Sequence, residues 1–300
     1  MAMEVGPPRG LRRAGPGPRQ AVIIGCETAT FTNWGTPMKP LKLVALALAF
    51  AALAGIAHAE KKKLIIATEG AYPPYNFVAA DGSLQGFDVD FAKALCSKLD
   101  ADCDIIKQDW DGMIPGLIAK KYDVIVASMG ILPEREEKID FSIPYYQSPT
   151  GLVASKAAAI KTGADGFVDP ESLAGKKIGV QRATAYETFA KEKWPKAEVV
   201  VYDSSESADL DMTAGRIDAR FDDFIVLQTG ILSGDSKDDF ERIGNIWGEK
   251  AFGSKGEGIG VRKGEKDLLE AINKAILDMR ADGTYKQIND KYFDFDIYGG

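Results

Sequence analysis

The residue with the clearest chemical capacity is Arg135, because a guanidinium can grip a carboxylate through two parallel hydrogen bonds. The apolar run 123–127 before it is typical of a short buried strand. Ser128 and Gly130 follow and leave backbone N–H groups open to a ligand, and Pro133 suits the first turn of a helix. Arg135 is therefore expected just beyond the carboxyl end of a strand, where open α/β sheets bind ligands. A surface arginine in a salt bridge is the alternative, and this stretch alone does not separate the two.

The elements that must position Arg135 alternate between strands and helices, which predicts an α/β fold. Apolar runs at 64–67, 103–106 and 123–127 read as strands, with helical spacing over 86–95 and 110–118 between them. The same order returns further along the chain, which indicates two α/β units in tandem. The second unit has expected strands at 150–154, 177–180, 199–202 and 216–221 and expected helices at 186–194 and 210–215, and two more helices follow at 265–282 and 283–291.

A signal-peptide pattern begins at Met38, where two lysines precede an apolar run over 43–56 and an A-x-A sequence ends at Ala59. We expect cleavage after Ala59, so that the signal peptide is 38–59 and the mature protein is periplasmic. The run is short for a membrane span, and a retained N-terminal anchor is the alternative. Residues 1–37 are rich in Pro, Gly and Arg and are expected to be disordered or to be a mis-called upstream extension.

Cleavage would remove the only histidine, His58, which excludes Ser–His and Cys–His catalysis and histidine metal sites from the mature chain. Cys26 also lies upstream of the cleavage point, which leaves Cys96 and Cys103. An even pair in an oxidising compartment is typical of a disulfide. A zinc site is the alternative, but it would need two further ligands of a kind that the sequence lacks. We expect no metal and no cofactor.

The charge balance favours a small cationic ligand. The whole chain has 37 basic and 44 acidic residues, of which 31 and 42 lie beyond residue 59. An acidic protein without basic runs is a poor binder of nucleic acid or of an anionic membrane. We therefore expect no nucleic-acid partner.

Several separated segments together resemble the polar amino-acid family of bacterial periplasmic solute-binding proteins, the receptors of ABC importers. Within that family the sequence is most similar to the lysine/arginine/ornithine/histidine receptors and to the octopine/nopaline (opine) receptors. The resemblance covers 62–300 and rests on TEGAYPPYNF (68–77), GFDVDFAKAL (86–95), DWDGMIPGL (109–117), DVIVASMGILPERE (123–136), KIDFSIPYY (138–146), LAGKKIGVQRATAYE (173–187), DMTAGRIDA (211–219) and DGTYKQINDKYF (282–293).

The resemblance implies a two-lobe periplasmic-binding-protein fold, the Venus-flytrap fold of type II, in which two crossing hinge strands join the lobes. Lobe 1 would comprise 60–148 plus 249–300, and lobe 2 would comprise 149–248. The family also implies a monomer.

The resemblance also implies roles in a cleft between the lobes. Arg135 matches the arginine that clamps the ligand carboxylate, and the backbone N–H of Thr184 would complete that contact. Asp223 matches the aspartate that pairs with the ligand α-ammonium, although the neighbouring Asp222 is an alternative. The full set of expected ligand contacts is Glu69, Tyr72, Trp110, Ala127, Ser128, Met129, Gly130, Arg135, Gln181, Thr184, Ala185, Tyr186 and Asp223.

Selectivity for the ligand side chain is expected in lobe 1. Glu69 matches an aspartate that meets the distal cationic group, and Trp110 matches an aromatic ring that stacks on the ligand. Tyr72 would provide a second wall. A core tryptophan and a solvated loop carboxylate are the alternatives for Trp110 and Glu69.

One departure from the pattern of the basic amino-acid receptors leaves the identity of the ligand open. Gly130 stands where the basic amino-acid receptors usually carry a serine, and the opine receptors resemble this chain in having Met-Gly there. The missing side chain makes space beside the α-amino group, as an N-substituted arginine would require. Gln181, Arg182 and Tyr186 also depart from the amino-acid pattern, and Arg182 could meet a second carboxylate.

These observations predict a periplasmic solute-binding receptor that captures arginine, lysine, ornithine or histidine by hinge closure and delivers it to an ABC permease. An opine receptor of the same type is the main alternative. A dehydratase-like enzyme, for which Glu69 is the one good acid–base candidate, and a sensor subunit are further alternatives.

Overall fold

The computed structural model describes residues 61–299. The expected N-terminal extension at 1–37, the signal peptide at 38–59, His58 and Cys26 therefore lie outside the described residues. Within the described residues, no helix combines the length and apolar character that a membrane span requires.

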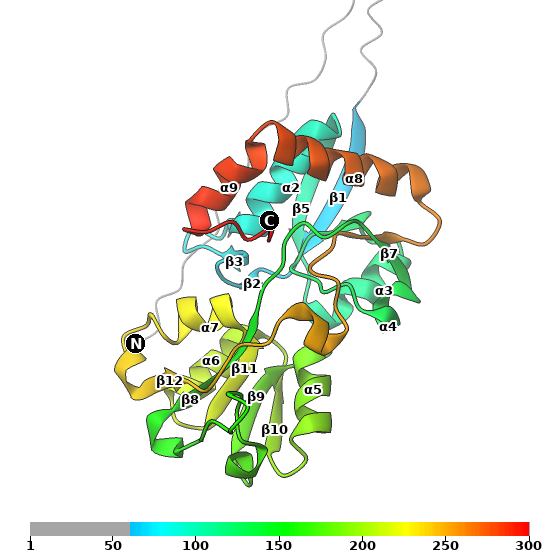
Figure 1. The fold of residues 1–300 in the computed structure, drawn as a ribbon. Helices are drawn as coiled ribbons and strands as arrows, with labels where there is room; N and C mark the ends of the chain where they lie inside the picture. Colours follow the sequence, from blue (N-terminus) through cyan, green and yellow to red (C-terminus); the bar gives the residue numbers. More distant parts are fainter. Residues whose placement is uncertain (1–60, 300) are drawn as a thin grey trace, which may run out of the picture. The chain divides into compact units, whose positions relative to one another are not determined.

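The first sheet has the strand order β5-β1-β6-β13-β7 (Figure 1). β1 pairs in parallel with β5 and β6, whereas β13 is antiparallel to both β6 and β7. Because β1, β5 and β6 run the same way, their carboxyl ends meet at one edge of the sheet. The strands are β1 (Lys62–Thr68), β5 (Ala101–Lys107), β6 (Val124–Ile125), β7 (Ile139–Phe141) and β13 (Gly260–Arg262).

The second sheet has the order β10-β9-β11-β8-β12 and repeats this parallel arrangement in β10, β9 and β11. β8 is antiparallel to β11 and β12. Its strands are β8 (Thr150–Ser155), β9 (Lys177–Gln181), β10 (Glu198–Tyr202), β11 (Ala219–Asp223) and β12 (Phe240–Arg242), and a small third sheet holds β2 (Ala71–Tyr72), β3 (Asn76–Val78) and β4 (Leu84–Gln85).

Helices cover the sheets because their apolar residues recur on one face. In the sixteen-residue α8, for example, Leu268, Ile272 and Ile276 are buried in the same core as Phe91 of α2. The helices are α2 (Phe87–Lys98), α3 (Met113–Ile118), α4 (Pro133–Glu136), α5 (Ala185–Lys193), α6 (Ser205–Thr213), α7 (Phe224–Gly230), α8 (Lys266–Ala281) and α9 (Thr284–Tyr292), with short 3-10 turns at Trp110–Gly112, Lys156–Ala158, Pro170–Leu173, Lys237–Asp239 and Glu249–Phe252.

Two antiparallel segments connect the two sheets (Figure 1). Isolated bridges pair Tyr146 with Glu257 and Thr150 with Trp247, so the outgoing and returning segments are hydrogen-bonded to each other. The expected lobes share these segments, and the boundaries at 148/149 and 248/249 stay a prediction.

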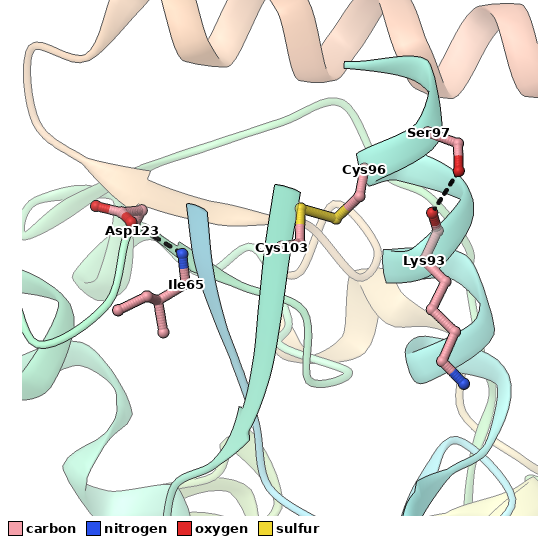
Figure 2. Close-up of a disulfide and its surroundings, with 6 residues drawn as sticks. All are labelled: Ile65, Lys93, Cys96, Ser97, Cys103 and Asp123. Carbon is pink, nitrogen blue, oxygen red and sulfur yellow. Dashed lines mark hydrogen bonds between the residues drawn. A yellow bond between two sulfur atoms is a disulfide. The ribbon is translucent and has the colours of Figure 1, made fainter. Parts of the chain in front are cut away.

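The expected disulfide is present between Cys96 in α2 and Cys103 in β5, with a Cα–Cα distance of 6.1 Å (Figure 2). It closes the short turn that leads from the helix to the edge strand. Neither cysteine lines the cavity described below.

Candidate ligand-binding cleft

A cavity lies where both sheets and the two connecting segments come together, with about 510 Å³ of space free of protein atoms, part of it open to solvent. Its walls are formed by Glu69, Tyr72, Trp110, Ala127, Ser128, Gly130, Leu132, Arg135, Thr150, Gln181, Thr184, Ala185, Tyr186, Glu249, Phe252, Ser254 and Glu257.

The parallel strands explain why distant residues gather there. Glu69 directly follows β1, and Ser128 comes shortly after β6. In the second sheet, Gln181 ends β9 and Thr184 opens α5. Of the thirteen ligand contacts expected from the sequence, all but Met129 and Asp223 line this cavity.

Arg135 is buried against backbone carbonyls. Nη1 donates to the carbonyl of Gly130 and Nη2 donates to that of Ala183, both at 3.0 Å. Its guanidinium also lies over the ring of Trp110, 5.2 Å from the centroid. Ala183 belongs to the second sheet's side of the cavity, so the Arg135 bond spans the cavity. Among residues 61–299 the guanidinium makes no salt bridge, which leaves its charge available to an anionic ligand group.

Glu69 and Gln181 form a second contact across the cavity. Gln181 Nε2 donates to Glu69 Oε1 at 2.6 Å and also to the carbonyl of Asp203 at 3.3 Å. Glu69 is 4% exposed. Burial, opposed by the Gln181 hydrogen bond and reinforced by nearby Asp222, raises the pKa of Glu69 to about 8. A cation placed beside Glu69 would favour its ionised form.

Tyr72 makes the third such contact, since its hydroxyl donates to Asp222 Oδ1 at 2.7 Å. Asp222 Oδ2 accepts from Ser205 and forms an ion pair with the fully buried Arg220 at 2.7 Å. The Asp222 carboxylate is therefore already neutralised and hydrogen-bonded, and it does not line the cavity.

Asp223 also has partners of its own. Oδ1 accepts the backbone N–H groups of Ile225 and Val226 at 2.7 and 3.2 Å, which caps the start of α7. The Tyr75 hydroxyl donates to Oδ2 at 3.3 Å. Burial raises the pKa of Asp223 to about 7. Because Asp223 is not among the lining residues, its contact with a ligand stays a prediction.

Three other expected residues have structural partners. The Met129 side chain packs into the apolar core beside β6. The backbone N–H of Ser128 donates to the Tyr145 hydroxyl at 3.1 Å, and its Oγ donates to Asp88 at 2.8 Å. Arg182 forms an exposed ion pair with Asp203 at 2.7 Å and does not line the cavity.

Thr184 has the local structure that the sequence predicts. It is the N-cap of α5, and its Oγ1 accepts the backbone N–H of Glu187 at 3.2 Å. The helix start therefore directs backbone N–H groups toward the cavity edge, where an anion is favoured.

The sequence interpretation missed the returning segment, which contributes Glu249, Phe252, Ser254 and Glu257. Glu257 is 6% exposed, and its Oε2 is buried without a hydrogen-bond partner among the described residues. Burial, with nearby Glu249 and Asp223, raises the pKa of Glu257 well above its usual range. No periodicity or motif in the sequence marks these residues as facing a cavity.

Gly130 borders an open space. A methyl group on its Cα would lie 3.5 Å from Glu257 Oε2 and 3.6 Å from both Arg135 Nη1 and Ser254 Oγ. These are ordinary contact distances, so a small side chain or ligand group fits there.

Comparisons with known proteins agree with this architecture. Residues 64–295 match the model for bacterial extracellular solute-binding proteins, family 3. The histidine-binding periplasmic protein of Escherichia coli is 40% identical over 267 residues, covering 88% of this chain and all of the relative. The L-arginine-binding protein of Pseudomonas aeruginosa is 39% identical over 265 residues, covering 87% and 99%. The solved structure of an ancestral arginine-binding protein bound to arginine is 35% identical with a TM-score of 0.69, covering 78% and 99%.

Proposed function

The chain belongs to the bacterial extracellular solute-binding proteins, family 3, and from that premise we propose that it is a periplasmic receptor for a basic amino acid. It would capture arginine, lysine, ornithine or histidine by cleft closure and deliver the ligand to an ABC permease. Its relatives include an ABC transporter arginine-binding protein and a lysine/arginine/ornithine-binding periplasmic protein. The two-lobed α/β fold expected from the sequence is confirmed by its structural neighbours.

The observation that carries the proposal is the balance of charge on the cavity wall. Among the lining residues, Arg135 is the single cationic side chain, whereas Glu69, Glu249 and Glu257 are carboxylic acids. A basic amino acid carries one carboxylate and two cationic groups, so it matches this wall better than a neutral or acidic ligand does.

The geometry supports a proposed role for each of these residues. Arg135 receives the ligand carboxylate together with the N-terminal turn of α5, and Glu69 receives the distal cationic group. Trp110 and Tyr72 form apolar walls for the ligand stem. The sequence-predicted ammonium partner, Asp223, does not line the cavity, so its contact with the ligand stays a prediction.

Cleft closure couples these contacts to transport. The bonds Arg135–Ala183, Gln181–Glu69 and Tyr72–Asp222 join the expected lobe 1, 60–148 plus 249–300, to the expected lobe 2, 149–248. A ligand that contacts both sides shifts the population toward the closed form. We propose that a monomer closed in this way docks on the permease after export and cleavage behind Ala59.

A second candidate, an opine receptor, is favoured by one observation, the open space beside Gly130. An N-substituent on the α-amino group could enter that space. Against it, Arg182 is paired with Asp203 outside the cavity and is not placed to receive a second carboxylate.

The test is calorimetric titration of refolded, ligand-free protein with arginine, lysine, ornithine, histidine, octopine and nopaline. Tight binding of one or more plain basic amino acids is expected. Binding of an opine alone would support the second candidate instead, and the absence of binding by all six ligands would overturn both candidates. The same sample is assayed for turnover of prephenate-like acids, because carboxylic acids with raised pKa could act as general acids. Turnover would contradict a purely receptor role.

A further inference from the structure

We propose that Asp88, a buried carboxylate outside the cavity, is a positioning residue for ligand binding. Through Asn76 it fixes the loop after β1, which presents Glu69. Through Tyr145 it fixes the loop after β6, which presents Ser128. The inference deepens the proposed function and rests on it, because it names the group that holds two walls of the same cavity in place.

Asp88 is an unusual carboxylate for the start of a helix. It lies in the first turn of α2 and is fully buried. Its oxygens accept from three neutral side-chain groups rather than from the N–H groups at the helix start. Burial raises the pKa of Asp88, and these three hydrogen bonds oppose that rise. A buried carboxylate without a cationic partner is costly, so the beginning of α2 does not by itself account for it.

One arm of the Asp88 network reaches the loop after β1. Asp88 Oδ2 accepts from Asn76 Nδ2 at 2.7 Å, and Asn76 Oδ1 accepts the backbone N–H of Gly70 at 2.7 Å. Both ends of the Asn76 amide are therefore used, which fixes its orientation. Gly70 directly follows Glu69, so these bonds hold the peptide unit that carries Glu69.

The other arm reaches the loop after β6. Asp88 Oδ2 also accepts from Ser128 Oγ at 2.8 Å, and Oδ1 accepts from the Tyr145 hydroxyl at 2.7 Å. The Tyr145 oxygen in turn accepts the backbone N–H of Ser128 at 3.1 Å. Ser128 has a left-handed backbone with φ of +52°, which a serine adopts at a cost. Its N–H and its hydroxyl are both held, and this loop continues to Gly130 at the cavity wall.

One carboxylate thus joins two separate parts of the cavity wall. Glu69 is the group proposed for the distal cation, whereas the Ser128 loop leads to Arg135, which is proposed for the carboxylate. Asp88, Asn76 and Tyr145 do not line the cavity, so they reach a ligand only through these loops. Binding groups that are already held in place lose less conformational freedom when the ligand binds.

The test is calorimetry of refolded, ligand-free protein with arginine and with citrulline, which carries a neutral urea group in place of the guanidinium. Asp88→Asn is the direct variant. An amide has a single accepting oxygen, so it cannot serve both arms. Arginine binding should weaken about tenfold or more, as the loss of a buried hydrogen bond implies. An affinity for arginine within about twofold of wild type would overturn the inference.

The two arms can be cut separately while the carboxylate stays in place, which also covers the case in which Asp88→Asn does not fold. Asn76→Ala releases the Glu69 loop, so the preference for arginine over citrulline should fall about fivefold or more. Tyr145→Phe releases the Ser128 loop, so the affinities for both ligands should fall by a similar factor and the preference should stay. A merely structural role would lower the free energy of unfolding without changing this preference. An unchanged preference in Asn76→Ala would therefore overturn the inference.

Asp90→Asn is the matched control, because it makes the same substitution in the same turn of α2. The Asp90 carboxylate instead accepts from Lys291 and Tyr292 at 3.1 and 3.0 Å, and it does not line the cavity. Both affinities should be unchanged in this variant, and a loss equal to that of Asp88→Asn would overturn the inference while leaving the proposed function intact. Failure of wild type to bind any basic amino acid would instead overturn the proposed function.

Discussion

Replacing Glu69 with glutamine should remove about one proton from those released when arginine binds at neutral pH. Burial raises the pKa of Glu69 to about 8. A group with that pKa is about nine-tenths protonated at pH 7. A guanidinium that contacts Glu69 stabilises the ionised carboxylate, so binding expels about 0.9 proton from this site at pH 7 and about 0.1 at pH 9.

The same proton sets the pH dependence of affinity. Ionising Glu69 at pH 7 costs about 1.4 kcal/mol, which is one pKa unit. The Glu69 contribution therefore makes arginine bind about tenfold more weakly for each pH unit below 8, and the dependence levels off above 8. Glu249 and Glu257, which also line the cavity, have raised pKa values as well, so a cation that approaches either of them would add to this release.

The assay is titration calorimetry of arginine in buffers of different ionisation enthalpy, for wild type and Glu69→Gln. The difference between the two proteins isolates the Glu69 proton. Glu192→Gln makes the same substitution at an exposed helix position away from the cavity and should release as many protons as wild type. Equal proton release by wild type and Glu69→Gln would refute the reasoning. In ligand-free protein, the raised pKa also means that the free energy of unfolding falls as pH rises from about 4.5 to about 8, because the native state retains a proton that the unfolded chain loses.

Two further changes test the clamp and the disulfide. Arg135→Ala should weaken arginine binding about 100-fold or more, because it removes a charge-assisted contact with the ligand carboxylate. Agmatine lacks the carboxylate, so the same substitution should weaken its binding far less. Comparable losses of affinity for the two ligands in calorimetry would contradict the clamp role. Arg135→Lys should fall between wild type and alanine, because a lysine cannot form the bidentate fork. Cys96→Ser should lower the free energy of unfolding by about 2.5 kcal/mol in denaturant titration, as expected for a crosslink that closes a loop of eight residues. Arginine affinity should be unchanged, since neither cysteine lines the cavity, and a tenfold loss would show an unexpected coupling.

Much of the fold follows from local sequence chemistry. The strand expected at 177–180 lies within β9, and the helical spacing over 265–282 corresponds to α8, Lys266–Ala281. The strand expected at 123–127 is shorter in the structure, because only Val124–Ile125 pair as β6 and the chain then leaves the sheet toward the cavity. Thr184 followed by Glu187 is a recognisable helix start, and the structure has that cap.

The cavity wall was predictable where it follows a strand and unpredictable where it depends on long-range pairing. Glu257 faces Arg135 because antiparallel bridges join it to Gly130 and Tyr146, more than a hundred residues earlier. No local pattern encodes that register. Asp223 shows another limit, since a carboxylate after a strand can face the cleft or cap the next helix; its two bonds to α7 show that it caps, and its contact with a ligand stays a prediction.

The Tyr72–Asp222 bond has a consequence for how such a receptor adapts to its surroundings. The bond joins the two expected lobes, and Asp222 does not line the cavity. A change at Asp222 that weakens the bond lowers the fraction of closed protein, and the apparent affinity for every ligand falls by the same factor. Substitutions at Asp222 can therefore change the ligand concentration at which the receptor saturates, while the order of its affinities for different ligands stays the same.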